Sequence, residues 1–431
     1  MRINLTHLGR LFLLLALPIF MNTSCKQNPG ENNANKREKS QAMTAQQEQN
    51  NNYVNDVAFL KRYMEIIELY DDKGNGKVAI APSLQGRVMT STTKYENGQS
   101  FGWLNYDLIE SGEIKEHFNP VGGEERLWLG PEGGQFSIYF KPGASFELDN
   151  WYVPKELDTE PFDLSSKRTD QISFTKRMSL LNYAGTMFDL TVDRTIRMVN
   201  RDKVAEVFGI TLEEGIDMVG FETENKLTNV GEHTWNEKTG MLSIWILSML
   251  NPSENTHVIL PFKKGSESAL GKILTDYRFS GDGVPSDRLS ILEDKGIVIF
   301  KADGQNRGKI GISQKRALPI AASYDSQNEV LTLAYFTLPE AEKGYVNSLW
   351  EIQDEPFAGD AVNSYNDGPL EDGTQLGPFY EIESSSPAAE LEKNESLVHV
   401  HGTIHFQGDK GKLEKLTKKL FNLELDEIGT D

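Results

Sequence analysis

The chain has 431 residues, with 44 Lys and Arg against 64 Asp and Glu, so its formal charge is −20. Its hydrophobic fraction of 38% is that of a globular protein and excludes a largely disordered chain. The acidic surplus repels phosphate backbones and argues against nucleic acid as a partner. The composition does not distinguish an enzyme from a binding protein.

Residues 1–25 have the pattern of a secretory signal. Two arginines precede an apolar run at residues 11–21, which is shorter than the roughly 20 residues of a bilayer-spanning helix. Cys25, the only cysteine, comes shortly after this run, behind Ser24. The pattern resembles the lipobox of bacterial lipoproteins, in which such a cysteine is lipidated. We therefore expect Cys25 to anchor the protein in a bacterial membrane, at the cell envelope; a plain secreted protein is the alternative.

The next segment, residues 26–52, is polar, with seven Asn and five Gln. A segment with so few apolar groups cannot offset the entropy that ordering costs, so we expect a flexible tether. Residues 53–431 are then expected to form a single folded domain. With no second cysteine, an intramolecular disulfide is excluded and stability must come from the core.

The folded part begins with one helical pattern and continues as strands. Apolar spacing predicts a helix over Tyr53–Tyr70, with Asn55 or Asp56 as its N-cap. Short β-branched or aromatic runs follow between Gly, Asn, Asp and Pro: Lys77–Pro82, Gln135–Phe140, Ser173–Met178, Thr186–Val199, Val204–Leu212, Asp217–Asn229, Leu242–Leu250, His257–Pro261, Gly296–Phe300, Gly308–Ile312, Glu329–Thr337 and Val398–Phe406.

So many strands, without helices in comparable number, predict an all-β fold of antiparallel sheets, a sandwich or a barrel. The absence of a fixed repeat period disfavours a propeller or solenoid. The leucines of Gly411–Leu425 are spaced for a short C-terminal helix that packs on the sheets.

The first chemically rich segment lies between Phe101 and Phe136. Paired glycines there allow close backbone approach to a ligand, tryptophans offer flat faces for sugar rings, and Arg with Glu supplies partners for hydroxyl groups. The candidate ligand-binding residues are Trp103, Glu124, Arg126, Trp128 and Glu132. The equally weighted alternative is a Gly-rich hairpin in which Trp128 faces the core while Glu125 and Arg126 pair on the surface.

Two later segments also carry titratable groups. His233, close to Trp235, lies in a polar turn and could act as an acid, although such a histidine is more often a plain loop residue. Alternation places Glu381 and Glu383 on one face of a strand, where burial would raise the pKa of one and produce a base. His399, His401 and His405 also share a strand face; we interpret them as surface or edge histidines in preference to a metal site.

Three motifs together resemble the galactose mutarotase-like superfamily, in a group of uncharacterised bacterial lipoproteins. They are Val-Gly-Gly-Glu-Glu-Arg-Leu-Trp-Leu-Gly-Pro-Glu-Gly-Gly at 121–134, Leu-Thr-Asn-Val-Gly at 227–231, and Gly-Pro-Phe-Tyr-Glu-Ile-Glu-Ser-Ser-Ser-Pro at 377–387. The resemblance spans about residues 55–410 and implies a β-supersandwich that binds sugars on a concave sheet face. In its aldose 1-epimerases a late glutamate deprotonates the anomeric hydroxyl, and Glu381 stands at that position, with Glu383 where the family has Gln. His117 or His233 would then be the acid.

Two functions from different classes follow. One is sugar anomer interconversion, with Glu381 as base and Arg126, Trp128 and Glu132 positioning the ring. The other is a non-catalytic carbohydrate-binding lipoprotein that uses Trp103, Trp128 and Trp235, and a structural envelope role is a third possibility. We expect no cofactor: no nucleophile elbow, Walker loop or dinucleotide fingerprint is present, and no Asp-rich loop supports a calcium site.

Overall fold

The computed structural model describes residues 51–71, 75–275, 277, 283–370 and 372–429. The predicted signal segment at 1–25, Cys25 and the tether up to residue 50 lie outside these residues, so the envelope anchor stays a prediction. Within the described ranges, no helix is long and apolar enough to cross a membrane.

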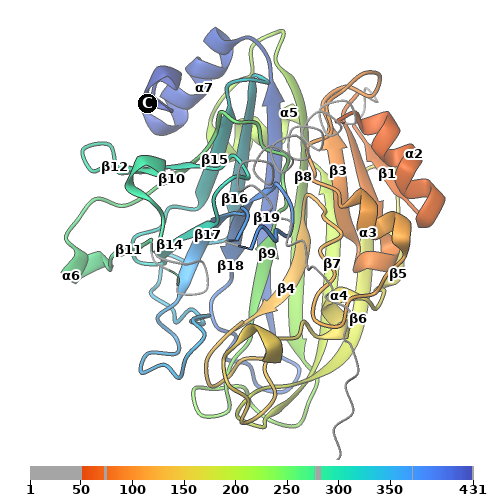
Figure 1. Ribbon diagram of the computed structural model, residues 1–431, viewed down its shortest axis with the longest axis vertical. Coiled ribbons are helices and arrows are strands. Elements are labelled where there is room, and N and C mark those ends of the chain that lie inside the picture. Colours follow the sequence, from red (N-terminus) through yellow and green to blue (C-terminus); the bar gives the residue numbers. More distant parts are fainter. Residues whose placement is uncertain (1–50, 72–74, 276, 278–282, 371, 430–431) are drawn as a thin grey trace, which may run out of the picture. The chain divides into compact units, whose positions relative to one another are not determined.

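Three antiparallel sheets form the fold, which confirms the predicted all-β class (Figure 1). The smallest has three strands: β1 (Ile67–Tyr70), β2 (Lys77–Ala81) and β3 (Arg87–Thr92). The largest has ten, in the order β12 (Leu289–Leu292), β13 (Ile297–Lys301), β10 (Thr256–Pro261), β15 (Ile320–Asp325), β16 (Val330–Phe336), β19 (Ser396–Gln407), β8 (Asp217–Asn229), β7 (Met187–Met198), β6 (Gln171–Leu181) and β5 (Asp163–Lys167).

The third sheet has six strands and carries the candidate site. Its order is β11 (Ile273–Leu274), β14 (Gly308–Ser313), β17 (Asp360–Asn366), β18 (Tyr380–Ser385), β9 (Ser243–Leu247) and β4 (Arg126–Gly130). The short α-helices of the described residues are α2 (Tyr53–Tyr63), α3 (Tyr106–Ser111), α4 (Lys155–Asp158), α5 (Arg201–Phe208), α6 (Glu267–Leu270) and α7 (Lys410–Phe421).

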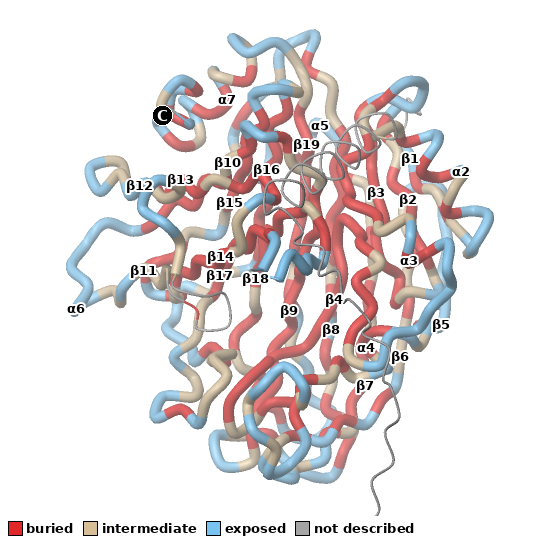
Figure 2. Tube along the Cα trace, viewed as in Figure 1, coloured by how far each residue is buried: buried red, intermediate tan, exposed pale blue. Residues whose placement is uncertain are grey.

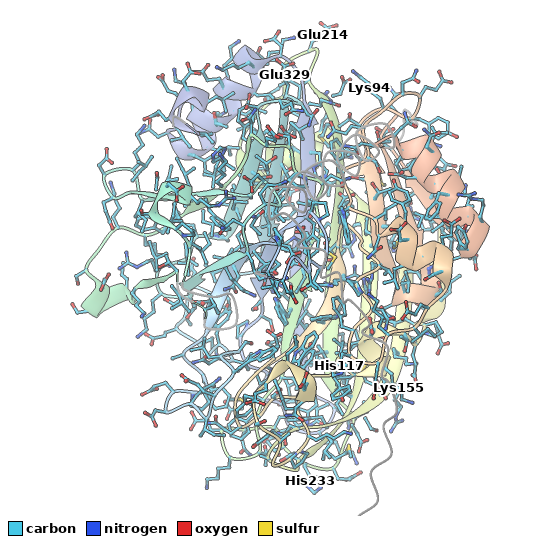
Figure 3. All side chains as sticks on the ribbon, in the orientation of Figure 1. Lys94, His117, Lys155, Glu214, His233 and Glu329 are labelled. Atoms are coloured by element: carbon cyan, nitrogen blue, oxygen red, sulfur yellow. The ribbon has the colours of Figure 1, made fainter. Side chains whose placement is uncertain are left out.

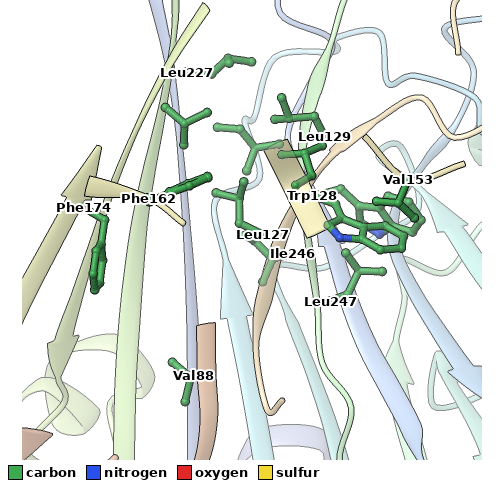
Figure 4. Packing of buried hydrophobic residues seen from close by; sticks show 14 of the residues in the cluster. Val88, Leu127, Trp128, Leu129, Val153, Phe162, Phe174, Leu227, Ile246 and Leu247 are labelled. Carbon is green, nitrogen blue, oxygen red and sulfur yellow. The ribbon is translucent and has the colours of Figure 1, made fainter. Parts of the chain in front are cut away.

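The main core lies between the six-stranded and the ten-stranded sheet, where the strands are buried almost throughout (Figure 2). Leu127 and Leu129 of β4 pack with Ile246 of β9 and with apolar residues of β6, β7 and β8 (Figure 4). On the other face of the large sheet, leucines of α7 and Val204 of α5 bury a second cluster. The predicted C-terminal helix is thus confirmed, although it ends at Phe421.

Three predictions about local structure are wrong. The helix predicted over Tyr53–Tyr70 ends at Tyr63, because Ile67–Tyr70 pairs with β2 as a hairpin strand, and its N-cap is Asn52. Val204–Leu212 is not a strand; it lies mainly in α5, which Asn200 caps at one end and Gly209, with φ 63°, closes at the other.

The third error concerns Gln135–Phe140, which forms no strand. Ser137 and Tyr139 instead hold a loop: the Tyr139 hydroxyl donates to the Leu129 carbonyl at 2.8 Å, and the Ser137 hydroxyl donates to the Glu132 carbonyl. The apolar side chains that suggested a strand are buried because the loop covers β4.

Candidate functional site

The outer face of the six-stranded sheet carries polar side chains that are nevertheless buried. Alternation turns the apolar residues of β14, β17, β18, β9 and β4 towards the large sheet and leaves the other set on the opposite face. That set is between 0 and 9% exposed and includes Arg126, Trp128, Trp245, Lys309, Asn363, Tyr365, Glu381 and Glu383. Polar groups on a buried sheet face cost desolvation free energy unless they are paired, so this face is a functional candidate.

Two loops exclude water from this face. One follows β4 and the other precedes β17, and they bond to each other: the Glu132 amide donates to Ser348 Oγ at 3.2 Å, and Gln135 Nε2 donates to the Gln353 carbonyl at 2.9 Å. The sheet face is therefore buried by two loops that lie far apart in the sequence.

Arg126 and Glu381 form a buried ion pair on this face. The distance from Arg126 Nη2 to Glu381 Oε1 is 2.9 Å, and both side chains are nearly inaccessible. The guanidinium also lies 4.3 Å from the centre of the Trp128 ring. Burial raises the pKa of Glu381 to about 8, against the opposing effect of the Arg126 charge. Glu381 is thus a carboxyl group that can exchange a proton near neutral pH.

Glu383 holds two other side chains in place. Its Oε2 accepts from Lys309 Nζ at 2.9 Å and from Trp245 Nε1 at 2.8 Å, while Oε1 has no hydrogen-bond partner among the described residues. Burial lowers the pKa of Lys309, but the attraction of Glu383 and Glu132 outweighs it, so the pKa of Lys309 is raised and the lysine is charged.

Beside Lys309 and Trp245 lies a cavity of about 300 Å³. Ser243, Tyr277, Asp360 and Asn363 also line it. Asn363 Nδ2 donates to the Tyr277 hydroxyl at 2.7 Å, and that hydroxyl donates to Asp360. Only glycine fits at position 311 beside these side chains, because a Cβ there would lie 2.2 Å from Asp360 Oδ2. Ser243 Oγ is buried and has no hydrogen-bond partner among the described atoms.

Glu132 is a second carboxyl group with a shifted pKa. Burial raises the pKa of Glu132 from 4.5 to about 7, and Lys309 opposes this shift. Because the folded protein binds this proton more tightly than the unfolded chain, the contribution of Glu132 to stability is complete below pH 4.5. It is lost as the pH rises towards 7.

We expect Glu132→Gln to remove this pH dependence. The wild type should lose on the order of 3 kcal/mol relative to the variant between about pH 4.5 and 7.5, since one pKa unit corresponds to about 1.4 kcal/mol. Urea unfolding at a series of pH values measures the difference. Parallel stability profiles of the two proteins would contradict the assignment.

The two histidines predicted as acids are not among the residues that line the cavity. His233 is exposed on the turn after β8, and its carbonyl accepts from Asn229 Nδ2 at 2.8 Å. His117 Nδ1 lies 2.7 Å from the Trp151 carbonyl, and its ring stacks on Tyr152 at 4.2 Å. Figure 3 shows both towards the lower end of the view, His233 at the very edge.

The predicted tryptophans are buried. Trp235, 1% exposed, packs edge-on against Phe188 in the core, and Trp103 packs on Phe379 at 5.0 Å. Trp128 is buried too, but on the outer face of the six-stranded sheet, where its ring lies 5.7 Å from that of Trp245 (Figure 4). The hairpin alternative, in which Glu125 and Arg126 pair on the surface, is wrong: Arg126 pairs with Glu381, while Glu125 pairs with Arg194 at 2.8 Å inside the protein.

The interpretation of three histidines as surface residues is wrong as well. His399 and His401 flank Ser384 Oγ at 2.8 Å each, and burial lowers the pKa of both to about 3. His405 Nε2 lies 2.7 Å from Glu124 Oε1, which also accepts from Ser91. This bonding network explains the burial of Glu124. Across the described ranges, no group of three His, Cys, Asp or Glu side chains is arranged to hold a metal ion.

Comparison with known proteins places the chain in a family. A family model described as a family of unknown function, DUF6786, matches residues 51–431. The chain belongs to that family. No curated protein matches the sequence.

Similar solved structures include a candidate aldose 1-epimerase from Escherichia coli K12, with 11% identity, 79% of this chain and 99% of that chain covered, and a TM-score of 0.48. A galactose mutarotase-like protein from Lactobacillus casei ATCC 334 has 12% identity, with 80% of this chain and all of that chain covered, and a TM-score of 0.44.

The sequence prediction missed the residues that line the cavity. Lys309 and Trp245 lie on strands that were predicted, and Lys309 is a charged residue within the otherwise apolar run Gly308–Ile312, which was the available signal. No such signal marked Tyr277, Asp360 or Asn363. Strand β17 was not predicted, and its neighbours in the sheet come from distant segments of the chain.

Proposed function

We propose that this member of the DUF6786 family binds a carbohydrate, one sugar ring at a time, in the cavity on the outer face of the six-stranded sheet. The observation that carries the proposal is the lining itself, in which the indole of Trp245 adjoins Lys309, Asn363 and Ser243 within one cavity. A sugar ring combines an apolar face with hydroxyl groups around its edge, and this lining supplies a partner for each.

The size of the cavity agrees with a small ligand. Its volume of about 300 Å³ is at the lower end of the range of about 300–1,000 Å³ typical of small-molecule sites. Because Glu383 fixes both Trp245 and Lys309, these two side chains are held in position before a ligand arrives. Such preorganisation lowers the entropic cost of binding.

A second candidate function is the interconversion of sugar anomers. Glu381, whose pKa is raised to about 8, favours it, because a base that works near neutral pH needs a pKa near neutral pH. Glu381 lies on the same sheet face as Lys309 but does not itself line the cavity. In this proposal the sugar extends from the cavity to Glu381, which takes the proton of the anomeric hydroxyl while Arg126 holds the carboxylate in place. A purely binding protein or a structural envelope protein are the competing functions.

One experiment tests both candidates. Saturation-transfer NMR of the protein with a panel of reducing sugars measures binding, and anomer exchange is followed in the same samples. Binding with accelerated exchange that Glu381→Gln abolishes supports the catalytic function. Binding without exchange leaves only the sugar-binding function. If no sugar in the panel binds, the proposed function is wrong.

A further inference from the structure

The lining of the cavity is more basic than the chain as a whole. Acidic residues outnumber basic ones by 64 to 44 in the sequence, yet the described lining has two lysines, Lys272 and Lys309, and one carboxyl group, that of Asp360. The overall charge of −20 repels anions, so this local balance does not follow from the composition. A lining of this kind is suited to a ligand that carries a negative charge.

The two lysines lie on one face of the sheet. Ile273 of β11 pairs with Ile312 of β14, so alternation places Lys272, the residue directly before β11, on the same face as Lys309. Lys309 is 7% exposed and its ammonium group lies 5.0 Å from the centre of the Trp245 ring, whereas Lys272 is exposed. A ring that stacks on Trp245 is therefore beside Lys309, and Lys272 adds a charge at the open part of the lining.

We propose that the cavity selects sugars that carry a carboxylate group, as hexuronates do, and that Lys309 and Lys272 recognise this group. The proposal rests on the sugar binding described above and names the class of sugar. Glu383 lies 2.9 Å from Lys309 and balances one positive charge. Lys272 forms no ion pair with any described residue and supplies the surplus.

Two other classes of charged sugar fit the lining less well. Phosphate groups favour the bidentate fork of an arginine side chain, and the described lining has no arginine. The ammonium group of an amino sugar needs a carboxylate partner. Asp360 already accepts from the Tyr277 hydroxyl, and burial raises its pKa, which makes it a weaker partner for a cation.

The affinity for a hexuronate should fall as the pH rises. The charged and titratable groups around Lys309 come from every neighbouring element: Lys272, Tyr277, Asp360, Glu381, Glu383, Arg126 and Glu132. Burial raises the pKa of Asp360, that of Glu132 to about 7 and that of Glu381 to about 8. Each of these groups becomes negative on losing its proton and then repels a carboxylate, so binding should be about tenfold weaker at pH 9 than at pH 6.

Matched pairs of sugars test the proposal by titration calorimetry. Glucuronate is compared with glucose and galacturonate with galactose, while glucosamine and glucose 6-phosphate represent the other charged classes. We expect each hexuronate to bind at least about tenfold more tightly than its neutral partner, and the pH dependence to be confined to the hexuronates.

A charge reversal at the exposed lysine tests its role. Lys272→Glu should remove most of the preference for the hexuronate and change the affinity for the neutral sugar by less than about threefold. Lys238→Glu provides the matched control, because Lys238 is an exposed lysine on the turn before β9 and lies outside the lining. It alters the net charge equally and should leave the preference unchanged. An unchanged preference in Lys272→Glu would overturn the role of Lys272.

Asp360→Asn covers the case in which a loss of affinity reflects only damage to the fold. Asparagine keeps an oxygen that can accept from Tyr277 but has no negative charge, so the hexuronate should bind about threefold to tenfold more tightly. Equal affinities within each matched pair would overturn the selection for a carboxylate and leave the sugar-binding function intact. Tightest binding by glucosamine or glucose 6-phosphate would do the same. If no sugar binds, the proposed function itself is refuted.

Discussion

Arg194→Met is expected to lower the free energy of unfolding by about 3–5 kcal/mol, the cost of removing one partner from a buried ion pair. Arg194 and Glu125 are both 0% exposed and lie 2.8 Å apart. Arg194 also donates to Asn225 Oδ1 at 2.7 Å and to the Gly86 carbonyl at 3.3 Å. The substitution leaves these acceptors without a donor and the Glu125 carboxylate without a countercharge.

The loss should depend on pH. Burial raises the pKa of Glu125, and Arg194 is the main influence that opposes this shift. Without Arg194, Glu125 will bind a proton in the folded state at a higher pH, so the variant should lose stability as the pH rises. Urea unfolding at pH 5 and pH 8 measures this, and the destabilisation should be larger at pH 8.

Arg197 on the same strand provides a matched control. Its side chain is 36% exposed and pairs with Glu222 at 3.1 Å and Glu224 at 3.4 Å. Because such surface pairs contribute about 0–1 kcal/mol, Arg197→Met should change the stability little. Equal destabilisation by the two substitutions would mean that burial of the Arg194 pair is not what matters.

Trp245→Leu should weaken sugar binding by roughly 30-fold, which corresponds to about 2 kcal/mol, if the cavity is the binding site. The substitution removes the flat ring on which a sugar would stack and also the hydrogen bond from Nε1 to Glu383. Titration calorimetry with a sugar identified by the NMR panel measures the change in Kd.

Trp245→Phe separates the two contributions. Phenylalanine keeps an aromatic face but cannot donate to Glu383, so it should retain most of the affinity if stacking dominates. Thermal unfolding of both variants shows whether the fold is preserved. An unchanged Kd in Trp245→Leu would place the binding site elsewhere.

Local patterns in the sequence predicted much of the fold. Alternation in Asp217–Asn229 and in Val398–Phe406 predicted two long strands, and these pair along their length as β8 and β19. The prediction failed where tertiary contacts override local preference. Gln135–Phe140 is apolar because it covers a sheet, and Val204–Leu212 has β-branched residues although its Asn and Gly boundaries belong to a helix.

The candidate site was predicted in part, for a similar reason. Glu381 and Glu383 were placed on one strand face by alternation alone, and β18 has both there. The partners of these carboxylates, Arg126, Lys309 and Trp245, are 74 to 255 residues away along the chain, and no local pattern assigns them.

The sequence by itself determined that the chain is globular and acidic, that its strands form antiparallel sheets, and that two carboxylates share a strand face. Those properties follow from composition and from the two-residue period of a strand. Only the tertiary structure decided which charges are buried together and which residues line the cavity. Burial and ion pairing depend on which strands become neighbours and which loops cover them, and both are set by contacts between distant parts of the chain.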